Sequence, residues 1–180
     1  MDQIHTLARQ DGQNHLIFCE HLPVFTVGPE GAGEWPVPTV PTDRGGSITC
    51  HAPGQLVAYF CFQAPQPARF YRRVVRAYDS FFSTMRLSAR YDRHRPGWYL
   101  KKRRKIASLG FRYREGVSLH GVALNVDPDL EFCNRIAPCN LADVRATSLR
   151  AEEVQTTMEE VRKALLVTIA KAFGEGNPQQ

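Results

Sequence analysis

The sequence predicts a single α+β domain over residues 1–180, in which a mixed or antiparallel sheet is flanked by helices. A chain of 180 residues is long enough for one domain with a real core, and 43% apolar with 23% charged residues is typical of a globular protein. Strand patterns gather in two blocks, and helical patterns begin near residues 70 and 157. Grouped strands with helices after each block favour α+β over alternating strand and helix units.

The first strand block ends near residue 62. Residues 15–20 have the β-branched and aromatic content of a short strand, and residues 47–50 and 55–62 predict two more strands. A type II turn suits the Pro-Gly pair between these two strands. Four prolines and three glycines in residues 28–41 predict a surface loop.

A helix and a second strand block follow. The helix is predicted because its apolar side chains share one helical face: Phe70, Val74, Val75, Tyr78, Phe81, Phe82 and Met85. Strands are expected over residues 97–100, 105–113 and 117–126, with a turn at residues 115–116.

A closing helix is expected over about residues 157–173. Thr156 and Glu159 have the spacing of a capping box at its start. Its buried stripe is predicted to consist of Val161, Leu165, Ile169 and Phe173.

Positive charge is concentrated in the middle of the chain. The net charge is +5, but residues 69–114 hold 15 Lys and Arg against two acidic residues, so the rest of the chain is net acidic. This asymmetry indicates either an acidic partner that docks on the basic segment or a solvated basic face.

Composition also excludes several classes of protein. The longest apolar run, residues 56–62, is too short to cross a bilayer, which takes ~20 residues, and the N-terminus lacks the apolar stretch of a secretory signal. Five cysteines without CxxC spacing argue against a disulfide framework or a zinc site and favour the cytoplasm. Neither a P-loop nor a GxGxxG motif occurs, so no nucleotide cofactor is expected, and the cysteine spacing gives no reason to expect a metal.

Four side chains are candidates for chemistry. Cys139 lies in a segment rich in turn formers, where it is either a nucleophile with a lowered thiol pKa or a buried small side chain. Lys105 opens an apolar segment and is either a partly desolvated proton shuttle or the last member of a solvated basic run. His51 and His120 are either proton acceptors or structural histidines.

Five motifs in order resemble the lipoyl(octanoyl) transferases, which move an octanoyl group from acyl carrier protein to a lysine of lipoate-dependent enzymes. The motifs span a core of residues 15–140. They are EHLPVFTVG (residues 20–28), RGGSITCHAPGQLVAY (44–59), KIASLG (105–110), GVSLHGVALN (116–125) and PC (138–139). The resemblance implies the α+β catalytic domain shared with biotin and lipoate protein ligases.

The resemblance also implies a site. Cys139 matches the acyl-thioester nucleophile of the family and Lys105 the lysine that assists it. The substrate-binding wall maps onto three stretches: Arg44, Gly45, Gly46, Ser47, Ile48, Thr49, Cys50 and His51; Ser108, Leu109 and Gly110; and Gly121, Val122 and Ala123. Its glycines would line a narrow tunnel and offer N–H groups to a thioester oxygen.

Three departures from the family pattern stand out. Ala52 and Asn140 replace usual glycines, and much of the helix before the first strand is expected to be missing.

The implied partners are octanoyl-acyl carrier protein as donor, and lipoyl domains of 2-oxoacid dehydrogenase E2 subunits and the glycine cleavage H protein as acceptors. No cofactor, nucleic acid or membrane is expected to take part. Three alternatives stay open: an ATP-dependent lipoate or biotin ligase on the same fold, a basic nucleic-acid-binding module, and a catalytically inactive protein that binds the carrier.

Overall fold

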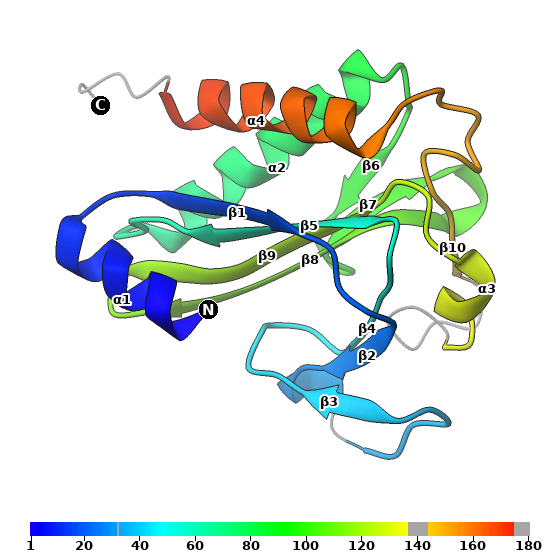
Figure 1. The fold of residues 1–180 in the computed structure, drawn as a ribbon, viewed down its shortest axis with the longest axis horizontal. Helices are drawn as coiled ribbons and strands as arrows, with labels where there is room; N and C mark the ends of the chain where they lie inside the picture. The colour runs from blue at the N-terminus through cyan, green and yellow to red at the C-terminus, as the bar shows by residue number, and fades with distance from the viewer. Residues whose placement is uncertain (32, 137–143, 175–180) are drawn as a thin grey trace.

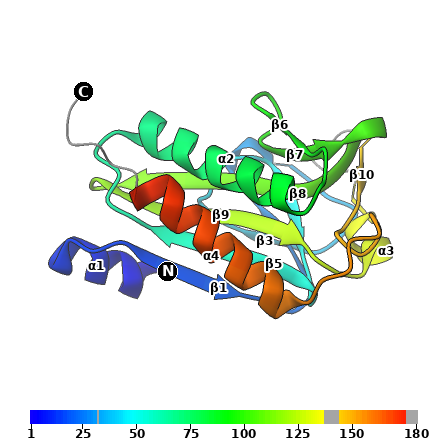
Figure 2. The same cartoon turned by 90° about the horizontal axis from the view of Figure 1, so that it is seen from above.

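A twisted seven-stranded sheet separates a pair of helices from a smaller sheet (Figures 1 and 2). The computed structural model describes residues 1–31, 33–136 and 144–174. The main sheet has the order β1-β5-β9-β8-β7-β6, all antiparallel, and β10 pairs with β8 in parallel. Its strands are β1 (His15–Cys19), β5 (Gln55–Cys61), β6 (Arg90–Asp92), β7 (Gly97–Leu100), β8 (Arg104–Arg114), β9 (Val117–Asn125) and β10 (Arg145–Ala146). The predicted α+β class is confirmed.

Helices α2 (Pro67–Thr84) and α4 (Met158–Gly174) cover one face of the main sheet (Figure 2). Pro67 suits the first turn of α2 because that position needs no backbone N–H. Most of the predicted apolar faces are buried, with Val74 and Leu165 each 0% exposed, whereas Val75, Met85 and Phe173 are partly buried. No helix in the described ranges combines the length and apolar character needed to cross a membrane.

The capping box of α4 lies one residue later than predicted. The Thr157 hydroxyl oxygen accepts from the Glu160 N–H at 3.3 Å, and the Glu160 carboxylate accepts from the Thr157 N–H at 2.8 Å. Thr and Glu also stand at positions 156 and 159, so the spacing fits both registers. Because α4 begins at Met158, the pair Thr157 and Glu160 forms the capping box.

A three-stranded sheet lies below the other face of the main sheet (Figure 1). Its order is β3 (Thr39–Pro41), β2 (Val24–Val27) and β4 (Ile48–His51). Residues 28–41 were predicted to be a surface loop throughout. They instead include the short 3-10 helix η1 (Pro29–Gly31) and end in β3. Pro41 is tolerated because β3 is an edge strand.

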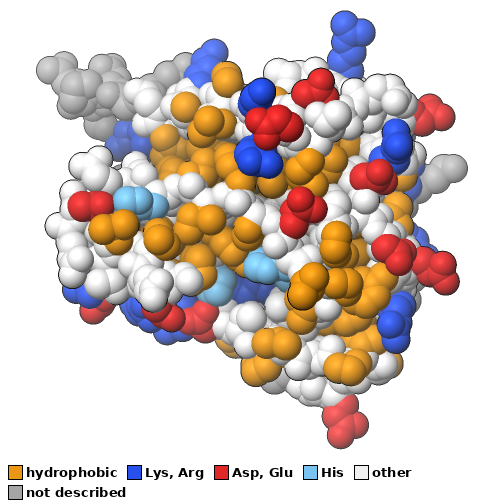
Figure 3. All heavy atoms as spheres, in the orientation of Figure 1, with side chains coloured by type: hydrophobic (Ala, Val, Ile, Leu, Met, Phe, Trp, Pro, Cys, Tyr) orange, Lys and Arg blue, Asp and Glu red, His pale blue; other side chains and the backbone are white. Residues whose placement is uncertain are grey.

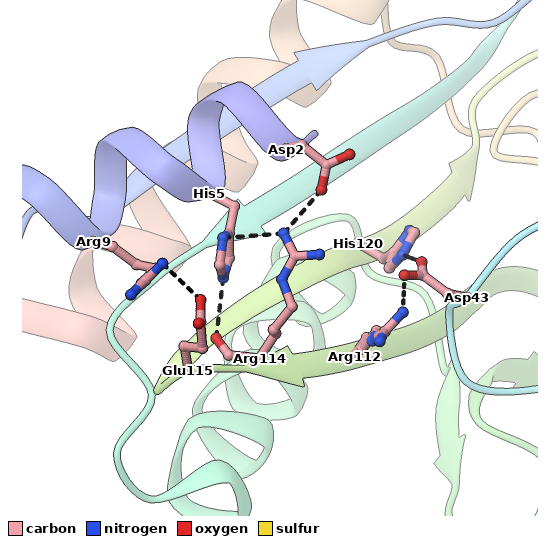
Figure 4. Close-up of polar contacts among 8 residues, drawn as sticks. All are labelled: Asp2, His5, Arg9, Asp43, Arg112, Arg114, Glu115 and His120. Atoms are coloured by element: carbon pink, nitrogen blue, oxygen red, sulfur yellow. Dashed lines mark hydrogen bonds and ion pairs between the residues drawn. The ribbon is translucent and has the colours of Figure 1, made fainter.

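Helix α1 (Asp2–Asp11) packs against the turn between β8 and β9 (Figure 4). His5 is 1% exposed and lies 3.0 Å from the carbonyl oxygen of Arg114, and Arg9 forms an ion pair with Glu115 at 2.7 Å. The resemblance predicted that much of this helix would be missing. A ten-residue helix is present and is anchored by these contacts.

A disulfide joins Cys50 of β4 to Cys133 of α3 (Leu130–Cys133), with the two Cα atoms 5.3 Å apart. The cysteine count argues against a disulfide framework and does not foresee this one bond. The two residues are 83 positions apart in the sequence, and only the fold brings them together.

Candidate active site

Alternation along the central strands sends every second side chain into the space between the two sheets. On β5, Ala58 and Phe60 pack against the helices, whereas Val57 and Tyr59 face the cavity. On β9 the side chain of Val122 packs on the helix side with 0% exposure. Val122, placed in the substrate wall by resemblance, therefore presents only its backbone there.

The cavity between the sheets has about 580 Å³ of empty space, part of it open to solvent. Figure 3 shows a hollow at this level, with histidine and Lys or Arg side chains in it. Its wall includes predicted residues Arg44, Thr49, His51, Ser108, Leu109, Gly110, Gly121 and Ala123. It also includes residues that were not among the predicted substrate-binding residues: His21, Val24, Thr26, Thr42, Val57, Tyr59 and His120. Period-two alternation within the motif strands is the signal that could have found most of them.

Gly45 lies directly on β8, so the segment that carries Arg44 forms a strap over the cavity. The Gly45 N–H donates to the carbonyl oxygen of Phe111 at 3.1 Å, and a Cβ on Gly110 would lie 2.6 Å from the Gly45 oxygen. The Gly46 N–H donates to the Glu30 carboxylate at 2.9 Å. Because these two N–H groups are bonded within the protein, Gly45 and Gly46 supply room for close backbone contact and not the donors that were expected.

The Arg44 side chain ties the strap to the small sheet. Its guanidinium donates to the carbonyl oxygen of Thr26 at 2.8 Å and to the Gly45 oxygen at 3.1 Å. Ser47 and Ile48 continue the strap along a neighbouring hollow that is also lined by Lys105.

Asp43 fastens the strap to the main sheet (Figure 4). Its carboxylate lies 2.6 Å from His120 Nε2 on β9 and also forms an ion pair with Arg112 on β8. Burial raises the pKa of Asp43, but the contacts with His120 and Arg112 outweigh it and leave this pKa below its ordinary value. Burial lowers the pKa of His120 despite the attraction of Asp43.

The hydrogen bonds of His51 define its tautomer. The Gln55 side-chain N–H group donates to the Cys50 carbonyl oxygen at 3.1 Å and to Asn125 Oδ1 at 2.9 Å. Gln55 Oε1 is therefore an acceptor, and His51 Nδ1 at 2.8 Å is its donor. Burial lowers the pKa of His51 to about 4, so the ring is neutral near pH 7, with its lone pair on Nε2.

A second neutral pair lies beside His51. His21 Nε2 is 2.7 Å from the Tyr59 hydroxyl, and the His21 and His51 rings are 5.4 Å apart. Burial lowers the pKa of His21 and raises that of Tyr59 to about 12. These three side chains are therefore polar and neutral near pH 7, and the guanidinium of Arg44 is the cation that acts on the pKa of both His51 and Tyr59.

Lys105 lies in an adjoining cavity that shares Thr49 and Ser108 with the first. Its side chain is 5% exposed, and Nζ lies 5.4 Å from the centre of the Tyr99 ring. The remaining wall of this cavity consists of Ile48, Cys50, Gln55, Asn125, Cys133, Ile136 and Ala146.

A β-bulge turns Lys105 toward this cavity. In the β7–β8 ladder Trp98 pairs with Ala107 and Tyr99 pairs with Lys105, so Ile106 is the extra residue. Without the bulge, alternation from Ser108 would place position 106 in the cavity and Lys105 on the helix side. Ile106 is instead 0% exposed in the core.

Cys139 and Asn140 lie outside the described residues. Ile136, the last described residue before this segment, and Ala146, the third described residue after it, both line the cavity that contains Lys105. Ala146 also pairs with Lys105, and the Thr147 N–H donates to the Lys105 carbonyl oxygen at 2.9 Å. In the described part of the chain, no three His, Cys, Asp or Glu side chains are grouped as metal ligands.

Comparison with known proteins agrees with this architecture. The family model of the lipoyl protein ligase A/B catalytic domain matches residues 1–170. The octanoyltransferase of Shewanella piezotolerans is 35% identical over 93% of this chain and 80% of its own length, and that of Shewanella denitrificans is 37% identical over 91% and 76%. The chain belongs to the octanoyltransferase family. It is therefore an acyltransferase.

Solved structures share the fold. Lipoate-protein ligase A bound with ATP superimposes with a TM-score of 0.76 at 17% identity, over 94% of this chain and 78% of that one. The bipartite lipoate protein ligase of Thermoplasma acidophilum gives 0.74 at 17% identity, over 96% and 80%. At this level of identity the likeness concerns the fold of the acyltransferase and not its substrates.

Proposed function

We propose that this acyltransferase moves an octanoyl group from octanoyl-acyl carrier protein to a lysine of lipoyl domains, through a thioester on Cys139. The observation that carries the proposal is the position of Lys105. It is buried in a cavity whose wall includes Ile136, directly before residues 137–143, and Ala146, three positions after them. An ammonium group held there would favour the thiolate form of a nearby cysteine.

The first step exchanges one thioester for another. The Cys139 sulfur forms a bond to the octanoyl carbonyl carbon, and the bond from that carbon to the carrier's sulfur breaks. The leaving thiolate takes a proton from the Lys105 ammonium.

The second step forms an amide. The neutral amine of the acceptor lysine attacks the acyl-enzyme, and the Cys139 sulfur leaves as a thiolate. Lys105, now neutral, takes the surplus proton from the attacking nitrogen, which restores the starting state. The thioester is already activated, so the reaction consumes no nucleotide.

The main cavity suits the acyl chain and its thioester. Neutral His51 and the His21–Tyr59 pair add polarity without charge, and Val57 and Ala123 add apolar surface. The proposed acceptors are lipoyl domains of 2-oxoacid dehydrogenase E2 subunits and the glycine cleavage H protein. The proposed location is the cytoplasm, where the reducing environment would keep Cys50 and Cys133 as thiols.

Intact-mass spectrometry tests the proposal. The full chain, incubated with octanoyl-carrier protein without ATP, should gain one octanoyl group and lose it when a lipoyl domain is added. Cys139→Ala should abolish both the adduct and the transfer, whereas Cys19→Ala, a change at a half-buried cysteine outside the cavity wall, should retain both. Transfer that requires ATP and survives in Cys139→Ala would instead identify an ATP-dependent ligase.

A further inference from the structure

The basic segment is divided between two separate places in the fold. Arg69 and Arg72 lie exposed in the first turns of α2, whereas a second group of cations surrounds the β6–β7 hairpin. Helix α2 has 18 residues, about 27 Å at 1.5 Å per residue, and its other end leads into β6. The first turns of α2 therefore lie far from the hairpin (Figure 2).

A groove runs along the hairpin at the edge of the main sheet. It is lined by the cations Arg90, Arg93, Arg95, Lys101 and Arg103, together with His94. Asp92 is the one acidic side chain among the described residues of this lining, and its carboxylate accepts from the His94 N–H at 2.8 Å within the hairpin turn. The groove is therefore strongly positive.

This groove lies next to the surroundings of Lys105. Tyr99 lines the groove, and its ring centre is 5.4 Å from Lys105 Nζ on the other side. Pro96 lines the hollow next to Lys105, while its neighbour Arg95 lines the groove. A partner bound in the groove thus has its contact surface one aromatic ring away from the proposed proton shuttle.

The arginines of α2 do not lie near Lys105 in this way. They lie on the helix that covers the face of the sheet opposite the cavity (Figure 1). Arg73 also packs its guanidinium over the Phe173 ring at 5.7 Å, which gives it a structural contact within the α2–α4 pair.

We propose that this groove along the β6–β7 hairpin, with its five cations between residues 90 and 103, is the docking surface for the acyl carrier protein. This inference rests on the proposed function and assigns the partner to one edge of the fold. Arg side chains bind phosphate oxygens through paired N–H donors, so they suit the phosphate that links the acyl arm to the carrier. The neighbouring cations would attract the acidic carrier surface and raise its association rate.

The test compares two charge reversals of equal size in the full chain. Arg93→Glu with Lys101→Glu changes two exposed residues of the groove, and Arg69→Glu with Arg72→Glu changes two exposed residues of α2. Each pair is assayed at several salt concentrations with octanoyl-carrier protein and with octanoyl-pantetheine, a small donor without protein or phosphate.

The groove variant should lose about tenfold or more in kcat/KM with the carrier donor, the scale on which surface fields alter association rates, and its salt dependence should flatten. Its rate with octanoyl-pantetheine should stay within about twofold of the wild type, as should both rates of the α2 variant. Equal losses in the groove and α2 variants, equal losses with both donors, or an unchanged groove variant would overturn the docking site while leaving the acyl transfer intact. A wild-type chain that accepts neither donor, or that binds duplex DNA at physiological salt and ignores the carrier, would overturn the proposed function itself.

Discussion

Lys105 of β8 and Ala146 of β10 pair in parallel register, so the described chain that follows residue 143 runs beside the buried lysine. The ladder between β10 and β8 is short, because only Arg145 and Ala146 of β10 pair with β8. The Thr147 N–H, which donates to the Lys105 carbonyl oxygen, extends the contact by one residue.

Lys105→Met should slow the alkylation of Cys139 near neutral pH, because it keeps most of the apolar stem and removes the charge. The midpoint of the pH profile should move toward ~8.5, the ordinary value for a thiol. Iodoacetamide kinetics, followed by mass spectrometry of the Cys139 peptide, measure this. Lys101→Met, at an exposed position, should leave the profile unchanged. Identical profiles in the wild type and Lys105→Met would show that the two residues do not interact.

Gly97→Ala should displace Lys105. Gly97 has φ +151°, and an added Cβ would lie 2.7 Å from Lys105 Cε and would also meet the carbonyl oxygen of Ala107. The backbone strain should lower the free energy of unfolding by about 1–3 kcal/mol, and the transfer rate and the Cys139 alkylation profile should change with it.

Gly116→Ala is the matched control for that substitution. Gly116 has φ +78° but no atom within 4 Å of an added Cβ. It should lose stability without any change in the alkylation profile, as measured by urea unfolding and iodoacetamide kinetics. A Gly97→Ala protein with an unaltered profile would argue against a positioning role for Gly97.

His51 should make the protein less stable as the pH falls. In the unfolded chain His51 takes up a proton near pH 6.5, whereas burial in the folded protein lowers its pKa to about 4. Between these values the unfolded state binds more protons than the folded state. The stability that neutral His51 allows is therefore fully present above about pH 6.5 and is progressively lost as the pH falls toward about 4. From about pH 7 to about pH 5 the loss should be about 2 kcal/mol.

Urea unfolding of His51→Gln at both pH values tests that slope. The variant should lose less stability on acidification than the wild type, although His21, whose pKa is also lowered by burial, retains part of the effect. His94→Gln, at an exposed position of the hairpin, should behave as the wild type. Equal acid-induced losses in His51→Gln and the wild type would contradict the assignment.

The Cys50–Cys133 disulfide should stabilise the oxidised protein. It joins residues 83 positions apart, for which the chain-entropy relation gives about 4.5 kcal/mol. Cys50→Ala and Cys133→Ala should each show this loss under non-reducing conditions, and dithiothreitol should produce the same loss in the wild type. Thermal unfolding and thiol counting by mass spectrometry measure it. Two additional reactive thiols in the untreated wild type would rule the bond out.

The spacing of apolar residues and the positions of turn-forming residues in the sequence were enough to predict much of the fold. The stripe from Phe70 to Phe82 predicts α2, and the Ala52–Gln55 turn is present with φ +84° at Gly54 and a hydrogen bond from Gln55 N–H to the Ala52 oxygen. These features depend on neighbours a few residues apart, which is why local patterns reveal them.

Other features depend on contacts between distant segments, and only the tertiary structure decided them. The bulge at Ile106 is set by pairing with β7, and it reverses the side to which Lys105 points. Val122 faces the helices because of its register in β9, and Cys50 meets Cys133 across 83 residues. The positive charge of residues 69–114, continuous in the sequence, is split by the fold between α2 and the hairpin groove. Sequence proximity constrains local conformation, whereas the packing of sheets and helices determines which side chains share a cavity.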